Sequence, residues 1–188
     1  MNTIEKNEYK LSNIDKINIV LGKNGCGKST LLRSIDAGIT GSQDEFGKSR
    51  YITPERGGAL RYAAGIEENI ARESNWISGQ RRRNQAENFR QQSVAQYRTL
   101  ESLILRGIDK DRTLPSFSVY IDKINSLLDN IEIRAGGATF QIFRKGSNQE
   151  LKAEDISSGE SELISLGIEC LIFGEERIAG KENILFLD

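Results

Sequence analysis

The sequence predicts an α/β fold, and three stretches carry that prediction. In the first, an apolar run at 17–21 leads into a glycine-rich loop at 22–30 and then into a helix-like run at 31–35. In the second, from about residue 66 to residue 130, polar residues alternate with apolar residues at helical spacing. In the third, an apolar run at 184–187, which is expected to form a buried strand, ends in Asp188. The order of strand, loop, helix and later strand is typical of α/β domains.

The composition limits the possible functions. A length of 188 residues fits one domain with room for an inserted subdomain, and 26 basic against 27 acidic residues give no overall charge that would attract nucleic acid. The absence of histidine excludes a Ser-His-Asp triad or a histidine-ligated zinc site within this chain. No run approaches the roughly 20 apolar residues of a membrane span. Two cysteines suit a reducing compartment, so we expect a cytoplasmic protein without membrane contact.

The loop at 22–30 matches the pattern G-x-x-x-x-G-K-[ST] between a predicted strand and a predicted helix. In that context the glycines let backbone N–H groups surround phosphates, and the helix start adds its positive dipole end. Lys28 would bridge the β- and γ-phosphates of ATP as a catalytic residue, and the Ser29 hydroxyl would ligate Mg²⁺. The alternative is a chance glycine turn. The residues expected to hold the nucleotide are Asn24, Gly25, Cys26, Gly27, Lys28, Ser29 and Thr30.

A second strand is predicted at 49–53, where Pro54 stops it. Before it, we expect an edge strand and turn within 1–16, a helix from about Lys28 to Ile35, and a loop from Gly38 to Gly47. Loops at the carboxyl ends of strands face the ligand crevice of an open α/β sheet. Glu55 on such a loop is therefore a candidate metal ligand beside Arg56, with a solvated turn as the alternative.

The region 66–130 is predicted to be a helical insertion, followed by a β-hairpin at 131–143. The insertion contains a basic stretch at 80–84, followed by Arg90 and Arg98. These residues are predicted to contact nucleic acid or a partner, and the alternative is that they form a solvated helix face. The apolar positions expected on one helix face are Phe89, Tyr97, Leu100, Ile104 and Ile108.

A second anion site is predicted at Ser157, Ser158, Gly159 and Glu160, directly before a long apolar helical run. Ser157 and Glu160 have the spacing of a capping box, so local helix capping is the alternative role of these residues. Asp188, at the end of the last strand, is a candidate catalytic carboxylate and Mg²⁺ ligand beside the phosphate loop.

These stretches together resemble a known family. Gly22–Ser29, Ile156–Glu160 and Ile184–Asp188, in this order, resemble the Walker A, signature and Walker B motifs of ABC-type ATPases. The run 157–160 departs from the transporter form Leu-Ser-Gly-Gly-Gln and looks more like the soluble branch. That branch includes SMC and RecF-like DNA-repair ATPases and the ATPases of overcoming-lysogenization-defect-type defence proteins. The run 51–56 is also similar to the defence branch, in particular to ATPase subunits of PARIS phage-defence systems, which partner a TOPRIM-type nuclease.

The resemblance implies a P-loop NTPase of the ABC-type ATPase head class. It divides the chain into 1–65 with Walker A, a helical insertion at 66–130, and 131–188 with the hairpin, signature helix and Walker B strand. It implies a homodimer or higher homo-oligomer with ATP and Mg²⁺ between the heads, where Ser157 and Gly159 close over the partner's γ-phosphate. The function would be that of a nucleotide-dependent sensor or assembly subunit in anti-phage defence, with a nuclease effector as a possible partner. The alternative is a DNA repair or recombination ATPase of the RecF/SMC type.

The chain departs from the family pattern after Asp188. In ABC-type ATPases a catalytic glutamate follows the Walker B aspartate, and then a D-loop and a switch histidine. Here the sequence ends at Asp188, so the C-terminal part of the core is expected to be missing. We expect this chain to bind nucleotide weakly and to hydrolyse little.

Overall fold

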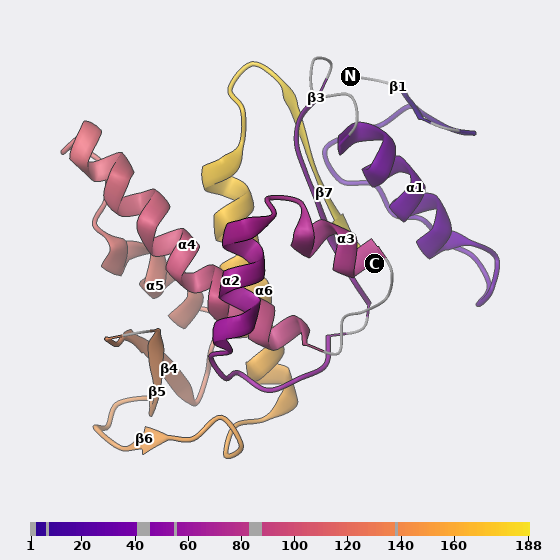
Figure 1. Ribbon diagram of the computed structural model, residues 1–188. Coiled ribbons are helices and arrows are strands. Elements are labelled where there is room, and N and C mark those ends of the chain that lie inside the picture. Colours follow the sequence, from indigo (N-terminus) through magenta and orange to yellow (C-terminus); the bar gives the residue numbers. More distant parts are fainter. Residues whose placement is uncertain (1–2, 7, 41–45, 55, 83–87, 138) are drawn as a thin grey trace.

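The structure is a computed structural model of mixed α/β architecture (Figure 1). It describes all residues except 1–2, 7, 41–45, 55, 83–87 and 138. The helices are α1 (Lys28–Thr40), α2 (Ala64–Arg72), α3 (Trp76–Arg82), α4 (Phe89–Lys110), α5 (Phe117–Asn125) and α6 (Ser158–Glu176). The strands are β1 (Thr3–Lys6), β2 (Tyr9–Ser12), β3 (Phe46–Ile52), β4 (Ile131–Ala135), β5 (Phe140–Arg144), β6 (Glu150–Leu151) and β7 (Glu182–Leu187).

The described strands form three small sheets. β1 and β2 pair as an antiparallel hairpin, and β4, β5 and β6 form an antiparallel sheet in that order. β3 and β7 pair in parallel although they lie far apart in the sequence, and Figure 1 shows them side by side. α1 packs on β3 and α4 packs along α6. This pairing brings the ends of β3 and β7 to the same edge, where the candidate site lies.

Two hydrophobic cores account for most of the buried apolar residues. The larger core joins α4, α5 and α6 to the β4–β5–β6 sheet, with Tyr97, Leu100, Ile124, Ile164 and Ile168 among its buried members. The smaller core joins α1 to β1, β3 and β7. Its buried members are Ile4, Ile35, Ile39, Phe46, Tyr51 and Phe186.

A buried ion cluster connects the two cores. Glu169 on α6 is fully buried and pairs with Arg81 on α3 and with Arg50 on β3. Arg50 also donates to Gln96 of α4, at 2.6 Å. Burial by itself would raise the pKa of Glu169, but the two guanidinium groups lower that pKa below its usual value near 4.5. The cluster therefore holds helices of the larger core against β3 of the smaller core.

The helical part of the sequence prediction is confirmed. The described part of the region 66–130 contains α2, α3, α4 and α5 and no strand, and the apolar face of α4 is buried at Phe89, Tyr97, Leu100 and Ile104. The hairpin at 131–143 forms β4 and β5, and the second strand forms with an earlier start, at Phe46. The N-terminal strand and turn are present as β1 and β2.

Three local predictions are wrong. The run 17–21 is not a strand, and Ile17 and Leu21 are 84% and 86% exposed. A strand needs a hydrogen-bonded neighbour, and no strand in the described part of the chain pairs with this run. The predicted loop at Gly38 is helical, because α1 continues to Thr40 and buries Ile39. The last strand is not fully buried: β7 pairs with β3 and with no other described strand, and Leu187 is 58% exposed.

Within the described residues, no helix is both long and apolar enough to span a membrane.

Candidate phosphate-binding site

The glycine-rich loop has the conformation that its glycines permit. Gly25 and Gly27 have φ values of 81° and 91°, a region that other residues rarely adopt. α1 begins at Lys28, directly after the loop, as predicted, and the carbonyl of Gly27 accepts a hydrogen bond from the N–H of Leu31 at 2.9 Å. The loop residues 22–27 are exposed. The exposed loop and the helix start directly after it thus provide backbone N–H donors and a positive dipole end of the kind that binds anions.

The Lys28 side chain lies back over its own loop. Its Nζ donates to the carbonyl oxygens of Gly22 at 2.9 Å and of Lys23 at 3.0 Å. The carbonyl of Lys23 also accepts a hydrogen bond from the N–H of Cys26 at 3.2 Å. The lysine is therefore held at the loop by backbone acceptors, and no described carboxylate forms an ion pair with it.

Ser29 and Asp188 meet although 159 positions separate them. Ser29 Oγ donates to Asp188 Oδ1 at 3.0 Å, and the second carboxylate oxygen accepts a hydrogen bond from Tyr51 Oη at 2.5 Å. Burial, and then the bond to Asp188, raise the pKa of Tyr51. The phenol therefore stays protonated as a donor, and the Asp188 carboxylate is fixed between α1 and β3.

The parallel pairing of β3 and β7 explains this meeting. Tyr51 is paired with Phe186 and Ile52 with Leu187, and the Asp188 N–H continues the ladder to the Ile52 carbonyl at 3.1 Å. Asp188 is thus placed one step beyond the last strand pair. Since α1 packs on β3, its first turn lies at the same edge.

Ser29 and Asp188 offer the hard oxygen ligands that Mg²⁺ prefers. No group of three or more acidic, histidine or cysteine side chains suited to a metal occurs among the residues that the structure describes. A magnesium ion here would therefore depend on nucleotide phosphates for further ligands, as is usual for Mg²⁺ in nucleotide sites. Glu55, the third predicted metal ligand, lies outside the described residues.

The loop before α6 is a helix cap, as its spacing predicted. The Ser157 side chain accepts a hydrogen bond from the N–H of Glu160 at 3.2 Å, and Glu160 Oε2 accepts from the N–H of Ser157 at 3.3 Å. Ser158 and Gly159 are exposed. No hydrogen bond among the described residues joins 157–160 to the loop 22–30. Both motif regions are formed, and the structure does not bring them together within this one chain.

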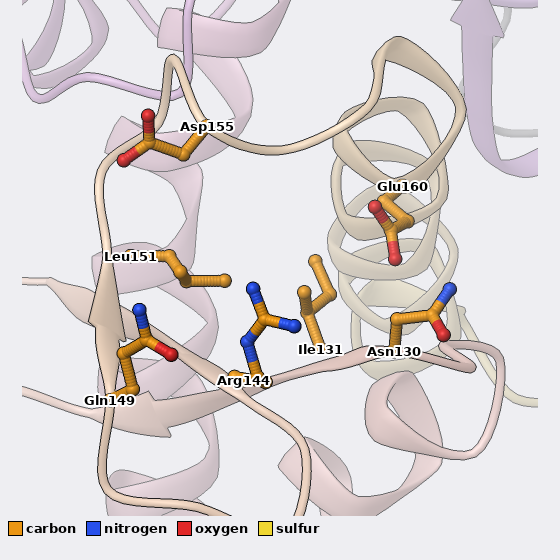
Figure 2. Close-up of a pocket in the computed structure, with 7 residues that line it drawn as sticks. All are labelled: Asn130, Ile131, Arg144, Gln149, Leu151, Asp155 and Glu160. Carbon is orange, nitrogen blue, oxygen red and sulfur yellow. The ribbon is translucent and has the colours of Figure 1, made fainter.

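A polar hollow of about 310 Å³ lies beside this cap and away from the phosphate loop (Figure 2). Glu160 points into it with Arg144, and Glu160 Oε1 is buried with no hydrogen-bond partner. The lining residues are Asn130, Ile131, Arg144, Gln149, Leu151, Asp155 and Glu160. Glu160 thus belongs to both the helix cap and the hollow.

The predicted basic surface is mostly committed to contacts within the chain. Arg81 is fully buried against Glu169, Arg82 pairs with Asp36, and Arg98 pairs with Glu67. Arg90 donates to the Gly58 and Ser158 carbonyls. Arg83 and Asn84 lie outside the described residues. The buried Arg81 fits none of the predicted roles of the stretch, which are a contact with nucleic acid, a contact with a partner and a solvated helix face.

Two contributors to the site were missed by the motif analysis of the sequence. The sequence predicts Tyr51 as a strand residue and Arg56 as a charge on a loop that faces the ligand crevice, both within the run 51–56, but it predicts no contact of either residue with Asp188. Arg56 donates from Nη2 to the Asp188 carbonyl at 3.0 Å, and its Nη1 pairs with Glu162 of α6. The one available signal was their position at the end of the second strand, the edge at which ligands bind in α/β folds.

Comparisons with protein-family models, curated proteins and solved structures gave no match to this chain. The likeness to ABC-type ATPases therefore rests on the motifs and on the geometry of these residues.

Proposed function

We propose that the chain is the nucleotide-binding part of an ABC-type ATPase that binds MgATP at residues 22–30 and Asp188. The observation that carries the proposal is the 3.0 Å hydrogen bond between Ser29 and Asp188. Two motifs identified separately in the sequence provide its two partners. A hydroxyl at the start of the loop helix and a carboxylate at a strand end form the Mg²⁺-holding pair of P-loop NTPases.

In this proposal each group has a defined task. Backbone N–H groups of 24–30 bind the phosphates, and Lys28 leaves its carbonyl partners to bridge the β- and γ-phosphates. Ser29 and Asp188 hold Mg²⁺, which neutralises charge on the phosphates when bound. Tyr51 keeps the Asp188 carboxylate oriented toward the loop.

The proposed biological role is that of a nucleotide-dependent sensor or assembly subunit in anti-phage defence. It rests on the resemblance of 51–56 and 157–160 to that branch. ATP between two heads would set assembly, and a nuclease subunit would perform the effector chemistry. A sensor needs nucleotide occupancy or a single triggered hydrolysis, whereas a machine needs repeated turnover, so the number of turnovers per trigger separates these two roles.

Binding of a fluorescent ATP analogue with Mg²⁺ tests the site. Lys28→Ala should lower the affinity of the folded chain at least tenfold, because it removes the only side-chain cation of the loop that faces the phosphates in this proposal. Lys16→Ala is the matched control: Lys16 is an exposed lysine shortly before the loop, and its loss should leave affinity within about twofold. Equal affinity of wild type and a folded Lys28→Ala variant would refute the proposal.

Subunit mixing tests the composite site in the full-length protein. Ser157→Arg should block the loop that closes over the partner's nucleotide, and Lys28→Ala should disable the loop that binds it. A heterodimer of the two variants contains one intact composite site, so hydrolysis should partly return although each variant alone is inactive. A mixture that exchanges subunits and stays inactive would limit Ser157 to its role as a helix cap.

A further inference from the structure

The polar hollow of Figure 2 lies between the β4–β5–β6 sheet and the start of α6. Ile131 of β4 is paired with Arg144 of β5. Leu151 of β6 is paired with Ile142, which lies two residues before Arg144. Paired residues share one face of a sheet, as do residues two apart along a strand, so these side chains lie on one face. Ile131 and Ile142 belong to the larger core, and the hollow therefore has a fixed apolar floor with a guanidinium beside it.

Three charged side chains complete the lining. Arg144 comes from the sheet, Asp155 from the loop before α6 and Glu160 from α6 itself. Glu160 Oε2 takes part in the helix cap, whereas Oε1 is buried and has no hydrogen-bond partner among the described residues. The Arg144 guanidinium likewise forms no ion pair or hydrogen bond with any residue that the structure describes. A buried acceptor without a donor costs free energy, and a ligand that brings a donor to Oε1 recovers it.

The size and access of the hollow favour a small polar ligand. Its volume of about 310 Å³ is near the lower end of the roughly 300–1,000 Å³ of small-molecule sites. Arg144 and Asp155 are exposed, so the hollow is open to solvent. The side-chain amides of Asn130 and Gln149 add further donors and acceptors to the lining. These features suit a ligand of amino-acid size.

We propose that this hollow binds a free basic α-amino acid, such as L-arginine or L-lysine. Two carboxylates and one guanidinium give the lining a single net negative charge. A basic amino acid carries the complementary set of two cationic groups and one carboxylate. Its cationic groups donate to Glu160 Oε1 and Asp155, and its carboxylate accepts from Arg144. Its methylene chain lies on the floor formed by Ile131 and Leu151. The site is separate from the phosphate loop and does not depend on the proposed function.

Isothermal titration calorimetry of the chain with L-arginine tests the site, and agmatine, which lacks the carboxylate, tests the role of Arg144. Wild type should bind L-arginine saturably and at least tenfold more tightly than agmatine, because the guanidinium–carboxylate pair is a charge-assisted contact. Arg144→Gln should weaken L-arginine at least tenfold and leave agmatine within about twofold. Arg134→Gln is the matched control: Arg134 of β4 does not line this hollow, and its loss should leave both affinities within about twofold.

Glu160→Gln tests the unpaired carboxylate oxygen while keeping the helix cap. Glutamine at this position also completes a capping box, so circular dichroism should show a folded chain. The hollow then receives an amide N–H group in place of the acceptor, and L-arginine should bind at least tenfold more weakly. Glu154→Gln is the matched control: Glu154 precedes Asp155 but pairs with Arg61 and does not line the hollow. It should bind L-arginine within about twofold of wild type.

Three results would overturn the proposal. The first is the absence of saturable binding of L-arginine and L-lysine up to about 10 mM. The second is an unchanged affinity for L-arginine in the folded Arg144→Gln and Glu160→Gln variants, which would place the ligand elsewhere. The third is equal binding of agmatine and L-arginine, which would show that the hollow does not recognise an amino-acid carboxylate. All titrations are made without nucleotide, so a failure here leaves the proposed MgATP site at 22–30 and Asp188 untouched.

Discussion

The two hydrophobic cores of this chain differ in size and in how completely they are closed. Among the described residues, the core around α4 and α6 has sixteen buried members, drawn mainly from helices and a three-stranded sheet. The core around the phosphate loop has six, and the run before the loop leaves Ile17, Ile19 and Leu21 exposed. The helical region therefore carries the stability, while the phosphate loop is attached to the less protected part. Regions with few buried contacts open at lower free energy than the global unfolding of the chain.

The largest expected effect comes from breaking the ion cluster between the two cores. Glu169→Gln leaves Arg50 and Arg81 without their shared carboxylate and should lower the unfolding free energy by roughly 3–5 kcal/mol. Urea denaturation at pH 7 measures this loss. Glu176→Gln is the matched control: Glu176 also pairs with Arg50 but is partly exposed, so its loss should cost under about 1 kcal/mol.

The same cluster predicts a pH dependence. Folding lowers the pKa of Glu169 from near 4.5 to about 2, so the unfolded chain binds this proton more readily than the folded chain. The stabilisation is therefore complete above about pH 4.5 and is lost as the pH falls toward 2. Denaturation curves between pH 7 and pH 3 should show a smaller loss of stability in Glu169→Gln than in wild type. Identical slopes would contradict this account.

Truncating one buried side chain in each core should show whether the two cores unfold independently, as measured by amide exchange. Ile168→Ala and Ile35→Ala both remove a fully buried side chain, and each should cost roughly 2–5 kcal/mol locally. The loss at Ile168 should speed amide exchange in both α4 and α6. The loss at Ile35 should speed exchange in α1 and β3 and leave α4 and α6 protected. Equal acceleration everywhere in both variants would show that the two cores unfold as one unit.

Tyr51→Phe should weaken the smaller core at the site itself. The substitution removes the Tyr51 hydroxyl, which is one of the two described side-chain donors to the Asp188 carboxylate. A hydrogen bond to a charged group contributes roughly 1.5–3 kcal/mol to the free energy of unfolding. We expect that loss in thermal or urea unfolding, together with a higher Mg²⁺ requirement for binding of the ATP analogue. Tyr62→Phe, at an exposed tyrosine that bonds Glu67, should change neither quantity measurably.

The smallest effect is expected at the cap of α6. Ser157→Ala removes the capping acceptor and should cost about 1 kcal/mol. Ser158→Ala, at the neighbouring exposed serine, should cost less than half of that. If Ser157 acts only as a cap, the dimerisation with MgATP that the proposed function expects should be unchanged in Ser157→Ala once the loss of stability is allowed for.

Sequence reasoning succeeded where the cause of a feature is local. The cap of α6 depends on Ser157 and Glu160, three residues apart. The phosphate loop needs positive φ values at Gly25 and Gly27, and glycine itself permits them. The motifs also predict the meeting of Ser29 and Asp188, but other contacts between residues far apart in the sequence were not predicted. Arg81 seemed part of a basic surface because its partner Glu169 is 88 positions away, and the bond of Tyr51 to Asp188 spans 137 positions. The pattern at 17–21 predicts a strand, but a pattern cannot supply the neighbour that a strand requires.

The resting position of Lys28 has a consequence for which anions the loop selects. The two carbonyl oxygens that hold its ammonium group are competitors that any incoming anion must displace. A small monovalent anion would replace the two carbonyl contacts of Lys28 with its own contact to the ammonium group, so its binding would gain little free energy. A triphosphate also takes up the N–H groups of the loop and of the first turn of α1, and therefore gains contacts that the resting loop cannot provide for itself. In the proposed function, selectivity should therefore follow the number of oxygen atoms that a ligand presents at once, more than the charge it carries.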